Sequence, residues 1–266
     1  YSSGGNPDVI PELTYEEFLN FHRKFYHPSN SYIFLYGNGD IEKQLLHIDE
    51  NYLSNFDKIE INSSIEIQKP FTSRNEIEAY YPISKNESDE NRTYLSLNFV
   101  LGENTDTETY IMTNILSQLL IESEAAPLKK ELIDAEIGED IFPIASGGLQ
   151  PGFGIVAKNT STNKKEEFEN IVFKTLNNLI KNGIDKKLIE ACINIVEYNL
   201  REASKFPTKG LIYNIISLDS WLYDGEPTAH LQYEETIKKF RANIGTDYFE
   251  KFIQDKIVNN PHSSLV

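Results

Sequence analysis

The chain has 266 residues and carries 25 Lys plus Arg against 41 Asp plus Glu, so its formal net charge is -16. Hydrophobic residues make up 39% of it, enough apolar mass for one or two folded domains. The acidity argues against a nucleic-acid partner, because phosphate binding needs a basic surface, and it permits basic or unfolded peptides. A membrane is not expected as a partner either, since no apolar run approaches the roughly 20 residues of a spanning helix.

The sequence also indicates the cellular compartment of the protein and whether the chain is part of a longer one. The single cysteine, Cys192, cannot form an internal disulfide and favours a reducing compartment. No signal peptide opens the chain, so we expect a cytoplasmic bacterial protein, with an organelle as the alternative. The chain begins at Tyr1 in a turn-rich stretch and stops at Val266 within a β-like run. We therefore expect an excised segment of a longer protein, the alternative being a processed protein with trimmed tails.

The first part of the chain predicts a helix, a strand and a second helix. Thr14 and Glu17 form a capping box, and the helix that they open is expected to end at His27-Pro28, because the residue before a proline avoids the helical region. The apolar run 31–36 predicts a short buried strand. Asp40 can cap the next helix, whose apolar side chains fall on one face: Ile41, Leu45, Ile48, Tyr52 and Phe56.

Strands are expected beyond a polar connection over residues 57–73. Residues 77–81 alternate between apolar and polar side chains, as in a strand. A cleaner alternation follows, whose period of two places one set of side chains on one face, as a half-buried antiparallel strand requires. That set is Thr93, Leu95, Leu97, Phe99 and Leu101.

Helices and strands then alternate. Residues 102–106 turn the chain into a predicted helix that carries Ile111, Ile115, Leu116, Leu119 and Leu120. A shorter helix is expected to start near Pro127, because proline suits the first helical turn. Residues 141–144 and 153–157 predict two strands that flank a glycine-rich link.

The remainder of the chain predicts helices. One carries apolar residues from Phe168 to Ile180 and is stopped by Gly183, and Asp185 can cap the next. Three more are expected over about 208–223, over about 228–240 and after Thr246. Alternating strands that give way to helices predict an α+β fold, in which helices pack on one side of a largely antiparallel sheet.

The five histidines do not form a metal motif. They are His22, His27, His47, His230 and His262, and no two are separated by three residues, so the helical zinc signature H-x-x-E-H is absent. His22 and His27 are not expected to share a helix face, since the second precedes a proline. We expect surface or capping roles for all five.

Other candidate groups also favour structural interpretations. Cys192 lies on the apolar stripe of its helix and is expected in the core. The glycines of residues 147–154 lack the Gly-Lys-Ser/Thr of a phosphate loop and predict a flexible hairpin-like link. The acidic run 87–90 predicts a solvated loop. Trp221 and Tyr223 are either core residues at a helix end or an aromatic pair that contacts peptides. We therefore predict no catalytic, cofactor-binding or metal-ligating residue in this chain.

Several segments together carry a resemblance to a known family. The first runs from Tyr1-Ser2-Ser3-Gly4-Gly5-Asn6-Pro7 through Ile10-Pro11-Glu12-Leu13-Thr14 to Tyr26-His27-Pro28-Ser29-Asn30. Two more are Asn182-Gly183-Ile184-Asp185 and Ser220-Trp221-Leu222-Tyr223-Asp224-Gly225-Glu226-Pro227. Together they resemble the insulinase/pitrilysin (M16) metallopeptidases, and most closely the presequence-protease subgroup, over nearly the whole chain.

The resemblance implies a zinc peptidase of four homologous α+β domains that close around an internal chamber. Its zinc would be held by an inverted H-x-x-E-H motif, whose Glu is the general base, and by a downstream Glu. These residues, and the assisting Arg and Tyr of the opposite half, have no matching positions here. The resemblance thus assigns residues 1–57 to the end of the first, catalytic domain without its metal motif, and 58–266 to most of the second, non-catalytic domain.

On this interpretation the longer parent is a zinc metalloendopeptidase that degrades oligopeptides, and the present segment is an inactive part of the chamber wall. Its partners would be peptide substrates, basic or unstructured, and the remaining domains of the same chain. Two alternatives remain open. One is a relative that has lost its zinc site and serves as a binding or assembly subunit, and the other is a free-standing peptide-binding module.

Overall fold

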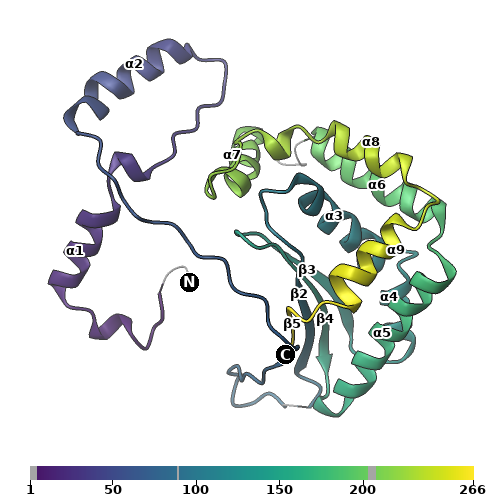
Figure 1. The fold of residues 1–266 in the computed structure, drawn as a ribbon. Coiled ribbons are helices and arrows are strands. Elements are labelled where there is room, and N and C mark those ends of the chain that lie inside the picture. The colour runs from purple at the N-terminus through teal and green to yellow at the C-terminus, as the bar shows by residue number, and fades with distance from the viewer. Residues whose placement is uncertain (1–4, 89, 203–207) are drawn as a thin grey trace. The chain divides into compact units, whose positions relative to one another are not determined.

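The computed structural model describes residues 5–88, 90–202 and 208–266, and it divides the chain into two compact units, Tyr1–Glu66 and Ile67–Val266 (Figure 1). The first unit contains two helices and three short 3-10 turns: η1 (Ile10–Glu12), α1 (Tyr15–Phe25), η2 (Pro28–Asn30), α2 (Ile41–Asn51) and η3 (Leu53–Asn55). None of the residues in these five elements is fully buried.

Capping hydrogen bonds mark the start of both helices of the first unit. At the start of α1 the Thr14 side chain accepts the Glu17 amide at 3.2 Å, and the Glu17 carboxylate accepts the Thr14 amide at 2.8 Å. At the start of α2 the Asp40 carboxylate accepts the Lys43 amide at 3.1 Å. The predicted capping box and the predicted Asp40 cap are therefore confirmed.

The strand predicted over residues 31–36 is wrong. This segment contains no regular element, and Tyr32, Ile33 and Tyr36 are 42%, 43% and 60% exposed. A strand forms only where a second strand pairs with it, and the described residues contain no strand beside this segment.

The second unit is built on a five-stranded sheet in the order β1-β5-β2-β4-β3. The strands are β1 (Asn75–Glu76), β2 (Thr93–Val100), β3 (Asp140–Ser146), β4 (Gly152–Thr160) and β5 (Ser263–Leu265). All neighbours run antiparallel except β1 and β5, which are parallel. The predicted strands at 93–101, 141–144 and 153–157 are confirmed.

The strand predicted over residues 77–81 is wrong in position. Only Asn75 and Glu76 belong to β1, and the Ile77 amide adds one further hydrogen bond to the Leu265 carbonyl at 2.9 Å. Tyr80 and Tyr81 are 90% and 50% exposed. The pairing ends where β5 ends, so the alternating residues beyond it have no partner.

Helices of the second unit cover one face of the sheet (Figure 1). They are α3 (Thr107–Ser117), α4 (Pro127–Asp134), α5 (Lys165–Asn182), α6 (Lys186–Glu202), α7 (Lys209–Trp221), α8 (Glu234–Ala242) and α9 (Tyr248–Ile253), and π-helical turns extend α3 over Gln118–Glu122 and α9 over Gln254–Val258. The helix predicted from about residue 228 is divided, because the backbone leaves the helical region at Gln232, between η6 (Ala229–Leu231) and α8.

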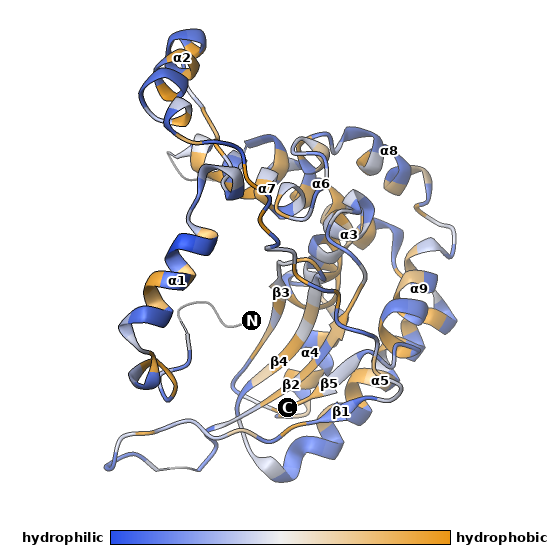
Figure 2. Ribbon diagram, turned by 60° about the vertical axis from the view of Figure 1, so that its left-hand side comes forward, coloured by the Kyte–Doolittle hydropathy of each residue, from blue (hydrophilic) through white to orange (hydrophobic). Residues whose placement is uncertain are grey.

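The core lies between the sheet and these helices. On β2 the side chains of Leu95, Leu97 and Phe99 are at most 4% exposed, whereas Ser96 and Asn98 on the other face are partly exposed. Hydrophobic ribbon lines this interior in Figure 2. The expected α+β fold, with helices on one side of a largely antiparallel sheet, is confirmed.

The residues that the structure describes include no helix that is both long and apolar enough to span a bilayer.

Candidate functional site

The histidines are dispersed over both units. His22, His27 and His47 belong to the first unit, and His230 and His262 to the second. Within residues 5–88, 90–202 and 208–266, no three His, Cys, Asp or Glu side chains come together as metal ligands would.

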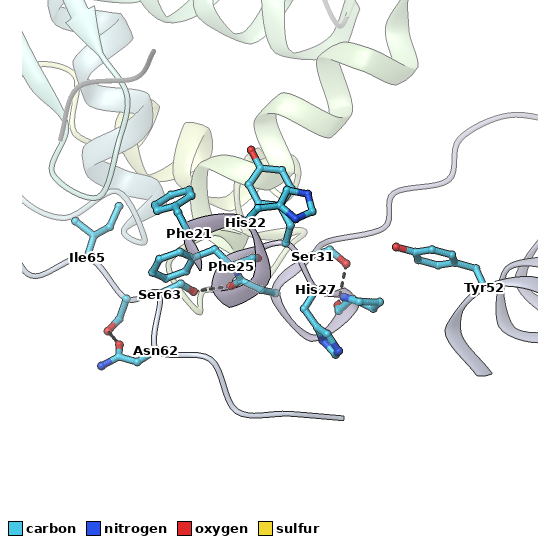
Figure 3. A pocket seen from close by; sticks show the side chains of 13 residues that line it. Phe21, His22, Phe25, His27, Ser31, Tyr52, Asn62, Ser63 and Ile65 are labelled. Atoms are coloured by element: carbon cyan, nitrogen blue, oxygen red, sulfur yellow. Dashed lines mark hydrogen bonds between the residues drawn. The ribbon is translucent and has the colours of Figure 1, made fainter. Parts of the chain in front are cut away.

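A pocket of about 860 Å³ lies within the first unit (Figure 3). Its lining includes Phe21, Phe25, Tyr26 and Tyr52, with the imidazoles of His22 and His27. The His22 ring stacks on Tyr26 at 4.6 Å, with the ring planes 14° apart. In the described part of the chain this lining contains no carboxylate and consists mainly of aromatic and small polar side chains, with two imidazoles.

Hydrogen bonds fix one wall of this cavity. The Asn30 side chain donates to the Phe25 carbonyl at 2.9 Å and accepts from the Ser63 hydroxyl at 2.6 Å. The Ser29 hydroxyl accepts the Ile59 amide at 3.1 Å, and His27 Nδ1 accepts the Ser29 amide at 3.1 Å. His27 is thus a capping residue, as the sequence predicts, and it holds a turn.

Cys192 lies in the core, as predicted. It is fully buried on α6, and burial raises the pKa of its thiol to about 11. Because the thiolate is the nucleophilic form, a thiol with a raised pKa in an apolar site is unreactive.

The surface or capping role predicted for every histidine is wrong for His262, which is 6% exposed, and for His230, the most enclosed histidine of the described residues. His230 is 1% exposed and stacks on Tyr110 of α3 at 4.1 Å, with the ring planes 12° apart. By normal hydrogen-bond geometry neither ring nitrogen has a partner in the described structure, although the Asn104 backbone lies close enough to favour the charged form. Burial dominates and lowers the pKa of His230, which is therefore neutral at pH 7.

The glycine-rich link is a β-hairpin connection, as predicted. It joins β3 to β4, and the Gln150 side chain within it makes two hydrogen bonds to the backbone of Gln68. The acidic run 87–90 is exposed at Glu87, Ser88 and Glu90, and Asp89 lies outside the described residues.

Helix α7 has an inverted pattern of burial that the sequence reasoning missed. Its fully buried side chains are the polar Ser217 and Ser220, which are 3% and 0% exposed. Leu211, Ile215 and Leu222 are 55%, 49% and 47% exposed. The spacing shows that the serines and these apolar residues lie on opposite helix faces, but it does not show which face is buried.

The stretch after α7 is a tight turn. The Ser220 hydroxyl donates to the Glu226 carbonyl at 2.7 Å, and the Gly225 amide donates to the Ser220 carbonyl at 3.0 Å. Burial raises the pKa of Tyr223, and the nearby Asp219 carboxylate raises it further. Burial likewise raises the pKa of Asp219. Trp221 and Tyr223 are both partly exposed, so this pair is not enclosed in the core.

Comparison with known proteins now identifies the family. The profile described as "Peptidase M16 inactive domain" matches residues 12–196, and the chain belongs to the M16 peptidase family. The resemblance to insulinase/pitrilysin peptidases is thereby confirmed, and the matching domain is of the inactive type.

Two curated relatives illustrate the relationship. Protein HypA of Clostridium perfringens is 51% identical over 268 residues, which is 100% of this chain and 27% of that protein. Presequence protease 1, chloroplastic/mitochondrial, of Arabidopsis thaliana is 34% identical over 271 residues, which is 98% of this chain and 25% of that protein. The chain thus spans about a quarter of the length of these relatives.

Solved structures share the fold. A protease from Helicobacter pylori superposes with a TM-score of 0.75 at 15% identity, over 98% of this chain and 60% of that one. A peptidase M16 inactive domain from Pseudomonas fluorescens superposes with a TM-score of 0.71 at 17% identity, over 100% of this chain and 60% of that one. At these identities the likeness concerns the fold alone.

Proposed function

We propose that this chain is a non-catalytic part of a zinc-dependent metalloendopeptidase that degrades oligopeptides inside a closed chamber, and that it forms part of the chamber wall. The observation that carries the proposal is the match of residues 12–196 to the inactive domain of M16 peptidases. The name of the Arabidopsis relative, a presequence protease, supports a peptide substrate for the parent.

The proposal assigns the two parts of the chain to different domains of the parent. Residues 1–57 would complete a catalytic domain whose metal motif lies elsewhere, and residues 58–266 would form most of the second domain. The exposed aromatic side chains around the cavity of the first unit, such as Phe21 and Tyr26, support a domain that continues beyond these residues. In the parent, zinc would activate water for attack on a peptide carbonyl. This chain supplies enclosure and no ligand.

Metal analysis tests this proposal directly. The full-length parent should contain stoichiometric zinc and cleave peptides in a chelator-sensitive reaction, whereas residues 1–266 alone should contain none and cleave nothing. Stoichiometric zinc in the 266-residue chain, or cleavage by it that a chelator stops, would refute its non-catalytic role.

The acidic composition gives the proposed wall an electrostatic role. A net charge of -16 raises the local concentration of basic peptides, and salt weakens the effect. The parent should therefore cleave a basic peptide faster than a neutral peptide of equal length at low salt, and the difference should shrink at high salt. Equal cleavage rates for the two peptides at low salt would contradict this electrostatic role, and the acidic composition would then serve only solubility.

The alternative proposal is a peptide-binding or assembly subunit whose parent has lost its zinc site. The "inactive domain" description of the matched profile is compatible with it. A zinc-free parent that still binds peptides would favour this alternative. We place the protein in the bacterial cytoplasm, in keeping with its high identity to a Clostridium protein. The chloroplastic and mitochondrial relative supports the organellar alternative.

A further inference from the structure

A single buried side chain anchors the chain between α7 and α8. Within residues 221–236, all of which the structure describes, His230 is buried and every other residue is exposed or partly exposed. The part of this stretch over residues 224–232, called the η6 segment below, contains the turn after α7 and the short helix η6. It packs against α3 and α7. The burial of this segment therefore depends mainly on one histidine.

Hydrogen bonds attach the η6 segment most firmly at its start. There the Glu226 carbonyl accepts the Ser220 hydroxyl of α7 at 2.7 Å. Farther along, the Thr107 hydroxyl of α3 donates to the Ala229 carbonyl at 3.3 Å, which is long for an O–H···O hydrogen bond. The part of the segment around His230 is therefore held chiefly by the packing of that side chain.

The surroundings of His230 suit a neutral imidazole. Both ring nitrogens are shielded from water, and among the described residues neither has a partner of normal hydrogen-bond geometry. A protonated ring has two N–H donors, and an ion buried with unpaired donors is costly. Three neighbours favour the charged ring: the Asp106 carboxylate, the Asn104 backbone and the face of Tyr110. Burial outweighs the first two and lowers the pKa of His230.

Helix α7 adds one more carboxylate to this site. Burial, and then the charge of Asp219, raise the pKa of Tyr110, the ring that stacks on His230, to about 12. Burial also raises the pKa of Asp219. This carboxylate therefore loses its charge at a higher pH than an ordinary aspartate, and it supports a charged His230 less well in acid.

We propose that His230 is a pH-sensitive switch, whose protonation in mild acid stabilises an open form in which the η6 segment has left α3 while the sheet and its helices stay folded. In the open form water hydrates the charged ring. This local opening is less costly than global unfolding, because the segment buries one side chain whereas the core joins apolar side chains from β2, α3, α5 and α6. The closed form keeps its full advantage above the ordinary histidine pKa of about 6.5 and loses it as the pH falls below that value.

Hydrogen exchange at single amides tests the switch in the 266-residue chain. The Ala229 and Leu231 amides donate to the Glu226 and Thr228 carbonyls, and they should exchange when the segment opens. Their protection factors, which are corrected for the pH dependence of the exchange chemistry, should fall about tenfold from pH 7 to pH 5. They should also stay at least about tenfold below those of the paired amides of β2 and β4, which need global unfolding to exchange.

Two matched variants assign the response to one histidine. His230→Phe keeps a ring against Tyr110 and takes up no proton, so protection in the η6 segment should no longer depend on pH in this range. His262→Phe is the control, since His262 is also buried in the second unit at 6% exposed, and it should respond as the unmodified chain does. Circular dichroism checks that both variants are folded. Independently of any variant, an NMR titration of the ring protons should show His230 gaining its proton as the segment loses protection.

Several results would overturn the inference. Equal protection in the η6 segment and the central strands would mean that only global unfolding exposes His230. An unchanged pH response in His230→Phe, or its loss in His262→Phe, would assign the response to another group. The inference is independent of zinc, so a parent without zinc would contradict the proposed peptidase and leave the switch unaffected.

Discussion

The Glu250 carboxylate accepts the backbone amide of Ile184 at 2.8 Å and so joins helix α9 to the turn between α5 and α6. The two residues are 66 positions apart, and Glu250 and Ile184 are each only 7% exposed. The turn contains Gly183 in the left-handed region, at a φ of 81°, where the backbone leaves α5. One buried acidic side chain thus replaces the next helical hydrogen bond at the end of α5.

This contact predicts a difference between two substitutions. Glu250→Ala leaves the buried Ile184 amide without an acceptor and should lower the free energy of unfolding by about 1–3 kcal/mol. Glu250→Gln keeps an acceptor oxygen and should lower the free energy of unfolding by less than Glu250→Ala does. Urea unfolding measures both, with Glu190→Ala on the exposed side of α6 as the control. Equal losses for Ala and Gln would mean that the amide contact contributes nothing.

The turn after α7 depends on a glycine. A Cβ at Gly225 would lie 2.9 Å from the Ser220 carbonyl oxygen and 3.2 Å from the Thr105 side chain. Gly225→Ala should therefore destabilise the chain by about 1–3 kcal/mol. At Gly147 the nearest atom to such a Cβ is Asp219 Oδ1 at 3.4 Å, so Gly147→Ala should change stability by less than about 0.5 kcal/mol. Denaturant midpoints compare the two variants, and similar midpoints would contradict the steric argument.

His230 makes stability depend on pH. Its pKa is lowered by burial, so the unfolded chain binds the proton more readily than the folded chain. Stability is therefore complete above the ordinary histidine value of about 6.5, falls as the pH drops below it, and levels off below the lowered folded-state pKa. Thermal unfolding measured at several pH values below about 7 should show that His230→Phe, which keeps a ring against Tyr110, loses less stability as the pH falls than the unmodified chain does.

A second histidine, His262, should account for the dependence of stability on pH that remains in the His230→Phe variant. Burial also lowers the pKa of His262, which packs edge-on against Phe71 at 4.7 Å. The His230→Phe variant should therefore retain part of the pH dependence. An unchanged slope in that variant would show that His230 titrates alike in the folded and unfolded chains.

The Gln68–Gln150 pair should protect a backbone amide in the extended segment before β1. The Gln68 amide donates to Gln150 Oε1 at 2.7 Å, and Gln150 Nε2 donates to the Gln68 carbonyl at 3.1 Å. Gln150→Ala should speed hydrogen exchange at the Gln68 amide with little effect on global stability, because both groups are exposed. Gln150→Glu keeps the acceptor and should give an intermediate rate. No change with Ala would indicate that water already competes for this amide.

Much of the helical structure could be predicted because its signals are local. The capping box of Thr14 with Glu17 and the termination of α5 at Gly183 each depend on a few neighbouring residues. Strands were less predictable, since each needs a partner far along the chain. The apolar run 31–36 looks like a strand by composition and has no partner in the described residues, whereas β2 lies between β4 and β5.

The burial pattern of helix α7 could be predicted only in part from the sequence. The helix expected over about 208–223 matches α7 at Lys209–Trp221. Periodicity identifies an apolar face, and the usual expectation is that this face is buried. The packing of Ser217 and Ser220 against the rest of the unit reverses that expectation, and the reversal depends on tertiary contacts that a single sequence does not reveal.

The place of β5 in the sheet sets an order of events during biosynthesis. It comes after every other element of the chain, yet it lies between β1 and β2, and its contact from Ser264 to Asn98 joins residues 166 positions apart. A nascent chain emerging from the ribosome can form its helices early and must wait for this last strand to close the sheet. Until β5 has been synthesised, β2 has an unpaired edge, and the incomplete sheet is open to aggregation along that edge.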